Sequence, residues 1–226
     1  MKIQSISEVV PKGGALKVAI YGVAGSGKTT FASTFPSPIF LDLNRGLLSI
    51  RDKTNIRALT LYNATFVEIK DAVKMAEDDP ECKSIIIDTI GEVSEACMSH
   101  SLTLNRRQKP EFDDWIAFFN MMKDFIIRLR NSPKNICVIC HEMTEKDENT
   151  GRIWCKPAFQ GQMKGKFDSY WDELYHAEVE TTPGKPPIYK LLARLSSIYT
   201  AKSRLLKKGS TESYLQPDYA EIIKLS

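Results

Sequence analysis

The sequence is poor in the features that mark membrane-embedded and secreted proteins. None of its apolar runs approaches the eighteen or so residues that a membrane-spanning helix needs. The first residues, Met1 to Ser5, contain no apolar core of a secretory signal. The five cysteines are odd in number and scattered, which is not typical of a disulfide framework. We therefore expect an intracellular, cytoplasmic protein with reduced thiols and no membrane partner.

Two further absences concern organisation and charge. No internal repeat, low-complexity stretch or linker divides the 226 residues, so we expect a single domain over 1–226 with a short N-terminal lead at 1–14. No acidic residue lies between Glu180 and Glu212, although the formal net charge of the whole chain is only +3. This stretch carries enough cations for a basic face, namely Lys185, Lys190, Arg194, Lys202, Arg204, Lys207 and Lys208.

The pair Cys137 and Cys140 has the spacing of half a zinc site. It lies, however, in an apolar run that predicts a strand, where residues three apart point to opposite faces. We interpret the pair as two core thiols.

Apolar runs and helical spacing alternate along most of the chain. Strands are expected at 16–21, 39–43, 57–62, 84–88 and 135–141, and later at 174–180, 188–195 and 197–201. Helices are expected at 28–35, 65–76, 90–102, 111–130 and 162–170, and a hairpin turn at 147–151. Alternating strands and helices predict an α/β fold with a mainly parallel central sheet, flanked by helices and followed by late antiparallel strands.

One segment between the first strand and the first helix has the pattern glycine, four residues, then Gly-Lys-Thr, typical of a phosphate-binding loop. Glycines allow the backbone to approach phosphates closely, successive N–H groups form an anion nest, and the following helix adds its positive dipole. Lys28 is expected to reach the β- and γ-phosphates, Thr29 to bind Mg²⁺, and Thr30 to lie near the α-phosphate. The predicted ATP-binding residues are Gly22, Val23, Ala24, Gly25, Ser26, Gly27, Lys28, Thr29 and Thr30.

Asp88 ends the strongly apolar strand 84–88. A carboxylate at such a strand tip can hold the Mg²⁺ shell, usually through water. The alternative is an ordinary aspartate that caps the next helix. With a phosphate loop upstream, the metal role is favoured.

The order of these parts resembles the RecA core, and in particular the small phage-encoded, RecA-like single-strand annealing proteins of the AAA-type ATP-binding class. The resemblance spans about residues 15–206. It implies a RecA-like P-loop NTPase core, a ring or filament of identical subunits, single-stranded DNA as partner, and the host cytoplasm as location if the protein is phage-encoded. A single-strand-binding protein is a further possible partner. The matching segments are Tyr21–Thr30, Phe40–Asp42, Ile85–Thr89, Val138–His141 and Ala201–Arg204.

The resemblance also implies roles for three residues in catalysis. His141 ends the strand that follows the metal-binding strand, the place of a γ-phosphate sensor in RecA-like proteins; the alternative is a solvent-exposed histidine. Lys202 and Arg204 are separated by one residue, so on a strand they would project from one face. RecA-like oligomers often insert such a pair into a neighbour's nucleotide site, as an arginine finger; the alternative is a solvated basic strand.

One position departs from the pattern. RecA-like enzymes place a glutamate just after the second core strand to orient the attacking water, and Asn44 stands here instead. An amide cannot accept a proton. Asp42 or Glu92 is a candidate substitute; otherwise hydrolysis is slow and the nucleotide acts mainly as an assembly switch.

Two segments occupy the places of the DNA-binding loops of a RecA-like core. Both combine cations with aromatic side chains, which suits a single strand because phosphates pair with cations and bases stack on rings. The alternative for any one of these cations is a solvated surface residue. The predicted DNA-binding residues are Arg106, Arg107 and Lys109 in the first segment, and Arg152, Lys156, Lys164 and Lys166 in the second.

Three functions remain open from sequence. The first is an ATP-binding, RecA-like recombination protein that pairs or anneals single strands. The second is a small phosphotransferase such as a nucleotide kinase, with Arg106 and Arg107 in a lid. The third is an accessory ATPase such as a helicase loader.

Overall fold

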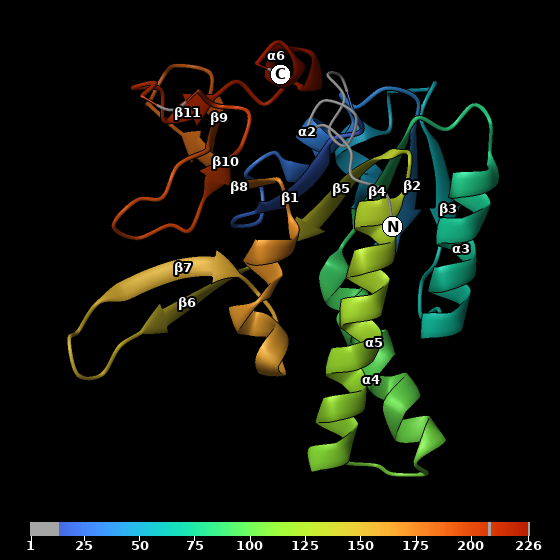
Figure 1. Ribbon diagram of the computed structural model, residues 1–226. Coiled ribbons are helices and arrows are strands. Elements are labelled where there is room, and N and C mark those ends of the chain that lie inside the picture. The colour runs from blue at the N-terminus through green and yellow to red at the C-terminus, as the bar shows by residue number, and fades with distance from the viewer. Residues whose placement is uncertain (1–13, 208, 226) are drawn as a thin grey trace, which may run out of the picture.

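The computed structural model describes residues 14–207 and 209–225 (Figure 1). The expected lead at 1–14 therefore lies outside the described residues, apart from its last position. A nine-stranded sheet forms the centre, with the strand order β11-β9-β8-β1-β5-β4-β2-β3, and β10 pairs with β8 beside this path. A separate hairpin pairs β6 with β7.

The strands are bounded as follows: β1 Lys17–Tyr21, β2 Pro38–Asp42, β3 Arg57–Thr60, β4 Ser84–Asp88, β5 Asn135–Cys140, β6 Glu142–Lys146, β7 Ile153–Pro157, β8 Glu173–Glu180, β9 Ile188–Leu192, β10 Lys202–Ser203 and β11 Tyr214–Leu215. The α-helices are α2 Lys28–Ala32, α3 Phe66–Asp78, α4 Ile90–Leu104, α5 Phe112–Asn131 and α6 Tyr219–Ile223. Three 3-10 helices complete the described elements: η1 Gly46–Ile50, η2 Gly161–Gly165 and η3 Phe167–Tyr170.

The central strands β8, β1, β5, β4, β2 and β3 run parallel, whereas β9, β10 and β11 pair antiparallel at one side. These pairings confirm the predicted α/β class, with a mainly parallel sheet and late antiparallel strands. Strand β5, later in the chain than β4, lies between β1 and β4. The carboxyl ends of these three strands therefore meet at one edge of the sheet.

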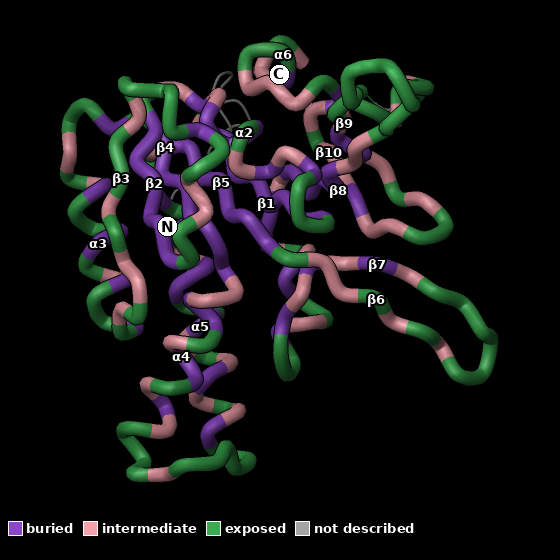
Figure 2. Tube along the Cα trace, turned by 180° about the vertical axis from the view of Figure 1, so that it is seen from behind, coloured by how far each residue is buried: buried purple, intermediate pink, exposed green. Residues whose placement is uncertain are grey.

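Helices cover both faces of the sheet, and the burial pattern follows (Figure 2). Alternate strand residues such as Ile85 and Ile87 pack with α3, α4 and α5, whereas Ile86 packs with α2, η1 and α6. Strands buried on both faces read as continuous apolar runs rather than alternating ones. This is why 84–88 and 135–140 were recognisable as strands from their composition.

The two cysteines of β5 confirm the prediction of core thiols. Cys137 packs in the cluster that contains α2, Cys140 packs in the cluster that contains α4 and α5, and both are fully buried. Throughout the described part of the chain, no three His, Cys, Asp or Glu side chains are grouped as a metal site. No helix in that same part combines the length and the apolar character that crossing a membrane requires.

The later third of the chain differs most from expectation. The predicted strand at 197–201 is wrong: Ser196 Oγ accepts hydrogen bonds from the amides of Ile198 and Tyr199 and turns the chain, and the strand forms at β10 instead. The predicted helix at 162–170 is two 3-10 turns, η2 and η3, of which η2 begins at Gly161 and ends at Gly165. The short β11 and α6 were not predicted.

Candidate nucleotide site

The phosphate loop joins the carboxyl end of β1 to α2, as the sequence predicts. Gly25 and Gly27 adopt φ values of 80° and 85°, which disfavour side chains with a Cβ. Gly22 is restricted by space as well, since a Cβ there would lie 2.6 Å from the carbonyl oxygen of Ala177 on β8. The loop is thus wrapped tightly around the end of the sheet.

Lys28 is the second part of the site. Its ammonium Nζ donates hydrogen bonds of 2.8 and 2.7 Å to the carbonyl oxygens of Gly22 and Val23. Burial lowers the pKa of Lys28, and the nearby Asp88 carboxylate opposes that shift. The charge is therefore held inside the curve of the loop, where an anionic phosphate would be drawn to it.

Asp88 at the end of β4 meets the loop directly. The Thr29 hydroxyl donates a 2.9 Å hydrogen bond to Asp88 Oδ2, although 58 residues separate the two in sequence. Asp88 is 2% exposed, and burial raises its pKa from 3.8 to about 6, with the Thr29 hydrogen bond acting in the opposite direction. An ionised carboxylate in this place favours a cation beside it.

The oxygen atoms of Thr29 and Asp88 are suitable ligands for Mg²⁺. A hard cation with oxygen ligands is usually bound by one or two protein oxygens, and completes its shell with water and substrate phosphates. Thr29 Oγ1 and Asp88 Oδ2 supply such a pair beside the loop that would hold the phosphates. Mg²⁺ held by Thr29 and Asp88 would supply positive charge to offset that of the phosphates.

A cavity of about 750 Å³ opens beside the loop and Asp88. It is large enough for a drug-sized or nucleotide-sized ligand. The described residues that line it include Gly25, Gly27, Lys28, Thr29, Thr30, Phe31, Asn44, Asp88, Thr89, His141, Tyr189 and Pro217. The predicted loop, metal carboxylate and sensor histidine therefore share one cavity.

A comparison with protein families agrees with this geometry. A model of a family described as "AAA domain" matches residues 15–205, most of the chain. The chain belongs to this AAA domain family. As an AAA-type P-loop domain it is a nucleotide-binding fold, for which ATP and usually Mg²⁺ are the implied ligands. A search of curated proteins with this chain found no significant match.

Tyr189 and Pro217 are among the lining residues of the cavity that were not predicted from sequence. Tyr189 on β9 lies with its ring against Gly27, where a Cβ would come within 2.9 Å of the ring, and Pro217 precedes α6. Both reach the cavity from the antiparallel side of the sheet. Tyr189 lies in a segment that was predicted as a strand, but no spacing in the sequence relates it to the loop.

His141 lies immediately after β5, which runs between the strands that carry the loop and Asp88. It is exposed to solvent within the cavity, close to Gly91 at the start of α4. His141 thus shares the cavity with Lys28 and Asp88, and its role as a γ-phosphate sensor stays a prediction.

The candidates for orienting water differ in their placement. Asn44 lines the cavity, whereas Asp42 accepts hydrogen bonds from the Tyr62 hydroxyl and the Gly46 amide. Glu92 accepts from the Thr89 hydroxyl and lines a separate cavity of about 400 Å³ between α3 and α4. Neither carboxylate is among the residues lining the nucleotide cavity.

The predicted arginine-finger pair lies far from the cavity of its own chain. Only Lys202 is in a strand, because β10 ends at Ser203, and the Arg204 guanidinium binds Asp172 at 2.5 Å. Asp172 is level with Lys17 at the start of β1, about 13 Å along the strand from the loop. Lys202 and Arg204 are therefore too far from the phosphate loop of their own chain to contact a nucleotide bound there.

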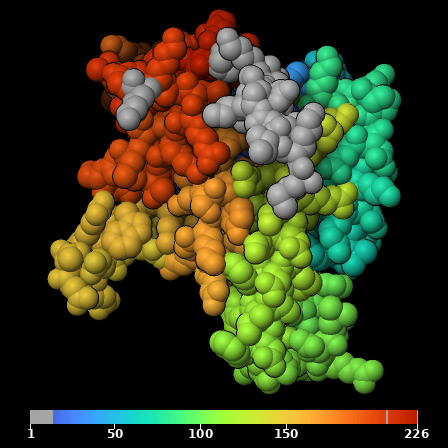
Figure 3. All heavy atoms as spheres, in the orientation of Figure 1, coloured from blue at the N-terminus to red at the C-terminus, as the bar shows by residue number. Residues whose placement is uncertain are grey.

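Figure 3 shows two projections, the α4–α5 tip and the β6–β7 hairpin, and five of the seven predicted DNA-binding cations lie in these two segments. The tip between α4 and α5 carries Arg106, Arg107 and Lys109, and the β6–β7 hairpin carries Arg152 and Lys156. The segment 161–170, with Lys164 and Lys166, lies between them and packs on α5. The sequence did not indicate that the α4–α5 tip lies apart from the hairpin, or that the hairpin and the 161–170 segment meet at Glu145.

Several of these cations are already paired. Asp114 accepts from Asn105, the Glu111 amide and Arg107, which together hold its pKa well below the usual range. Lys156 and Lys164 both pair with Glu145, and Lys166 lies 4.9 Å from the centre of the Phe119 ring. Arg106, Lys109 and Arg152 are exposed, and no ion pair is recorded for them in the described part of the chain.

The raised pKa of Asp88 means that its ionised carboxylate lowers the free energy of unfolding of the nucleotide-free protein at neutral pH. Between about pH 4 and 6 the folded protein holds a proton on Asp88 that the unfolded chain releases, so the free energy of unfolding falls as pH rises through that window. Asp88→Asn should therefore raise the free energy of unfolding of the nucleotide-free protein at pH 7.5 by roughly 1–3 kcal/mol. Urea unfolding at pH 7.5 and 4 measures this, and the gain should vanish at the lower pH. A variant less stable than wild type at pH 7.5 contradicts the assignment.

Lys28→Ala should abolish nucleotide-dependent behaviour while the fold stays intact. Loss of a charge-assisted contact to phosphate is expected to weaken Mg-ATP binding by about 10–100-fold. Isothermal calorimetry measures the affinity, and circular dichroism checks the fold. Lys74→Ala, at an exposed position on α3, is the matched control and should bind as wild type does. Unchanged ATP affinity in Lys28→Ala would count against the site.

Proposed function

We propose that this AAA domain binds and hydrolyses Mg-ATP, assembles with copies of itself on single-stranded DNA, and promotes annealing or pairing of strands. The nucleotide part rests on one observation, the Thr29–Asp88 hydrogen bond beside the buried Lys28. The ATP base would lie toward Tyr189, whose half-exposed ring offers an aromatic face at the far side of Gly27.

The DNA part rests on the two projections and on the RecA-like resemblance. Arg106 and Lys109 extend beyond the sheet at the α4–α5 tip, next to Phe112, which is 75% exposed. Unpaired cations beside an exposed ring suit a flexible single strand. Lys156 and Lys164 contribute less to this proposal, because Glu145 already offsets their charge.

Self-assembly is proposed because Lys202 and Arg204 lie away from their own loop. Another subunit could receive the pair at its nucleotide, provided that Arg204 exchanges Asp172 for phosphate. A homo-oligomeric ring or filament provides such a contact between neighbours.

ATP turnover with and without single-stranded DNA tests the proposed function. We expect DNA to stimulate turnover, and labelled single strands to shift in gels and to anneal. Turnover is expected to be slow, because the cavity presents Asn44 where a general base would act. Phosphate transfer to a nucleoside monophosphate without a DNA effect would favour the kinase alternative. Strand binding without annealing would favour an accessory ATPase.

Arg106→Ala combined with Lys109→Ala tests the DNA surface separately. Removing two phosphate contacts should weaken single-strand binding and lower the slope of log affinity against log salt by about 1.4. Fluorescence anisotropy across a salt series measures both. The double variant Lys74→Ala with Lys83→Ala removes two exposed cations elsewhere and serves as control. An unchanged slope in the tip variant would exclude this surface.

A further inference from the structure

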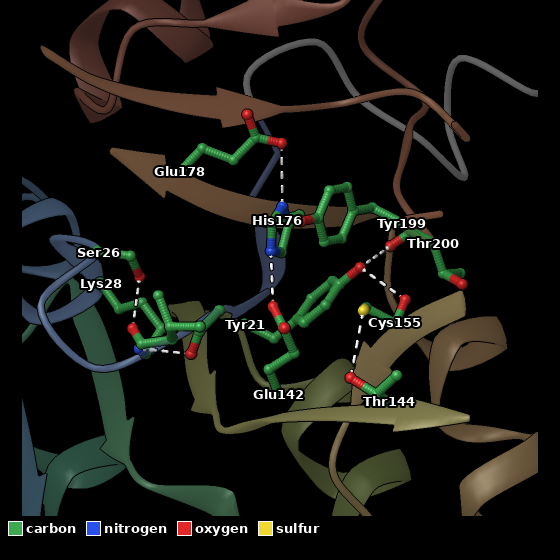
Figure 4. Close-up of polar contacts among 12 residues, drawn as sticks. Tyr21, Ser26, Lys28, Glu142, Thr144, Cys155, His176, Glu178, Tyr199 and Thr200 are labelled. Carbon is green, nitrogen blue, oxygen red and sulfur yellow. Dashed lines mark hydrogen bonds and ion pairs between the residues drawn. The ribbon is translucent and has the colours of Figure 1, made fainter. Parts of the chain in front are cut away.

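A buried histidine lies beside the phosphate loop, outside the residues that line the nucleotide cavity (Figure 4). His176 on β8 is 4% exposed and is level with Tyr21, the last residue of β1. Its Nε2 lies 2.7 Å from Glu142 Oε2, and its Nδ1 lies 3.1 Å from Glu178 Oε1. Both ring nitrogens are therefore within hydrogen-bond distance of a carboxylate.

Two carboxylates and two aromatic rings surround the imidazole. Carboxylate oxygens only accept hydrogen bonds, so a ring nitrogen that carries a proton can donate to the carboxylate beside it. The Tyr199 ring stacks on the imidazole at 3.8 Å with an interplanar angle of 14°, and the Tyr21 ring lies 4.9 Å away. The ring is thus held through both nitrogens and through one face.

Glu142 connects this cluster to the nucleotide cavity. It follows His141 directly in the chain, at the start of β6. The His141 carbonyl accepts a 2.8 Å hydrogen bond from the Ala158 amide, which closes the base of the β6–β7 hairpin. His141 therefore lies between two fixed neighbours. Cys140 before it belongs to β5, and Glu142 after it contacts His176.

The same histidine also adjoins the loop. Ala177, the next residue on β8, is the one whose carbonyl oxygen leaves no room for a Cβ at Gly22. Glu142 is also close enough to act electrostatically on Lys28. The histidine cluster and the phosphate loop are therefore neighbours in the fold.

We propose that His176 is a positioning residue that acts through Glu142: it holds His141 in the orientation that contacts the terminal phosphate of a bound triphosphate. The proposal rests on the proposed nucleotide function. It assigns to His176 a contribution to telling a triphosphate from a diphosphate, since His141 would contact only the terminal phosphate.

Nucleotide discrimination tests this positioning role without requiring turnover. Dissociation constants for a fluorescent non-hydrolysable Mg-ATP analogue and for the matching Mg-ADP analogue are measured for wild type and four variants. His141→Ala gives the effect of losing the sensor. His176→Gln and Glu142→Gln break the proposed connection, the second with almost no change in shape. Glu178→Gln is the matched control, because it alters the other side of the same ring without touching the chain next to His141.

The expected result is a loss of triphosphate preference by about 5- to 10-fold in His141→Ala, Glu142→Gln and His176→Gln, with diphosphate affinity within about 2-fold of wild type. Glu178→Gln should keep most of the preference. A normal preference in both Glu142→Gln and His176→Gln, or in His141→Ala, overturns the proposal. So does an equal loss for both nucleotides, which indicates a structural role only. If wild type binds neither analogue, the proposed function itself fails.

Discussion

The hydrogen bond between the Thr29 hydroxyl and the Asp88 carboxylate is the contact on which the candidate site depends. It joins the first turn of α2 to the end of β4 across β5, and so brings the loop and the Asp88 carboxylate to one edge of the parallel sheet. The parallel register makes this possible, because β1, β5 and β4 all end at the same edge. His141 enters the cavity for the same reason.

Holding Asp88 there has a cost that the nucleotide complex would offset. The carboxylate is almost fully buried and lies near Asp42 and Glu92, all of which favour its protonated form. Lys28 is likewise buried, with its charge satisfied by loop carbonyls rather than by an anion. A metal ion would stabilise the buried Asp88 carboxylate, and a phosphate would stabilise the buried Lys28 ammonium, since each ligand supplies the opposite charge. The site is thus built for ligands of both signs at once.

Around this edge, short contacts link the loop to segments distant in sequence. The Tyr21 hydroxyl donates to the carbonyls of Cys155 on β7 and Thr200, so the residue before the loop is bound to the hairpin and to the chain leading into β10. The His176 cluster adds Glu142 and Tyr199 to the same junction. Burial of these polar groups with satisfied partners makes the junction rigid.

Local patterns in the sequence determined the parts of this protein that depend on near neighbours. The glycines and Lys28 of the loop, the apolar strand ending in Asp88, the thiols of β5 and the α/β class were all predicted, because their signals lie within a few residues. Tertiary structure alone decided the rest: that Tyr189 and Pro217 line the cavity, that Glu145 pairs with Lys156 and Lys164, that Arg204 binds Asp172, and that His176 lies between Glu142 and Glu178. These contacts join residues from strands and loops whose pairing is not encoded in any local period. Side chains that meet through sheet order and loop packing leave no spacing in the sequence by which to find them.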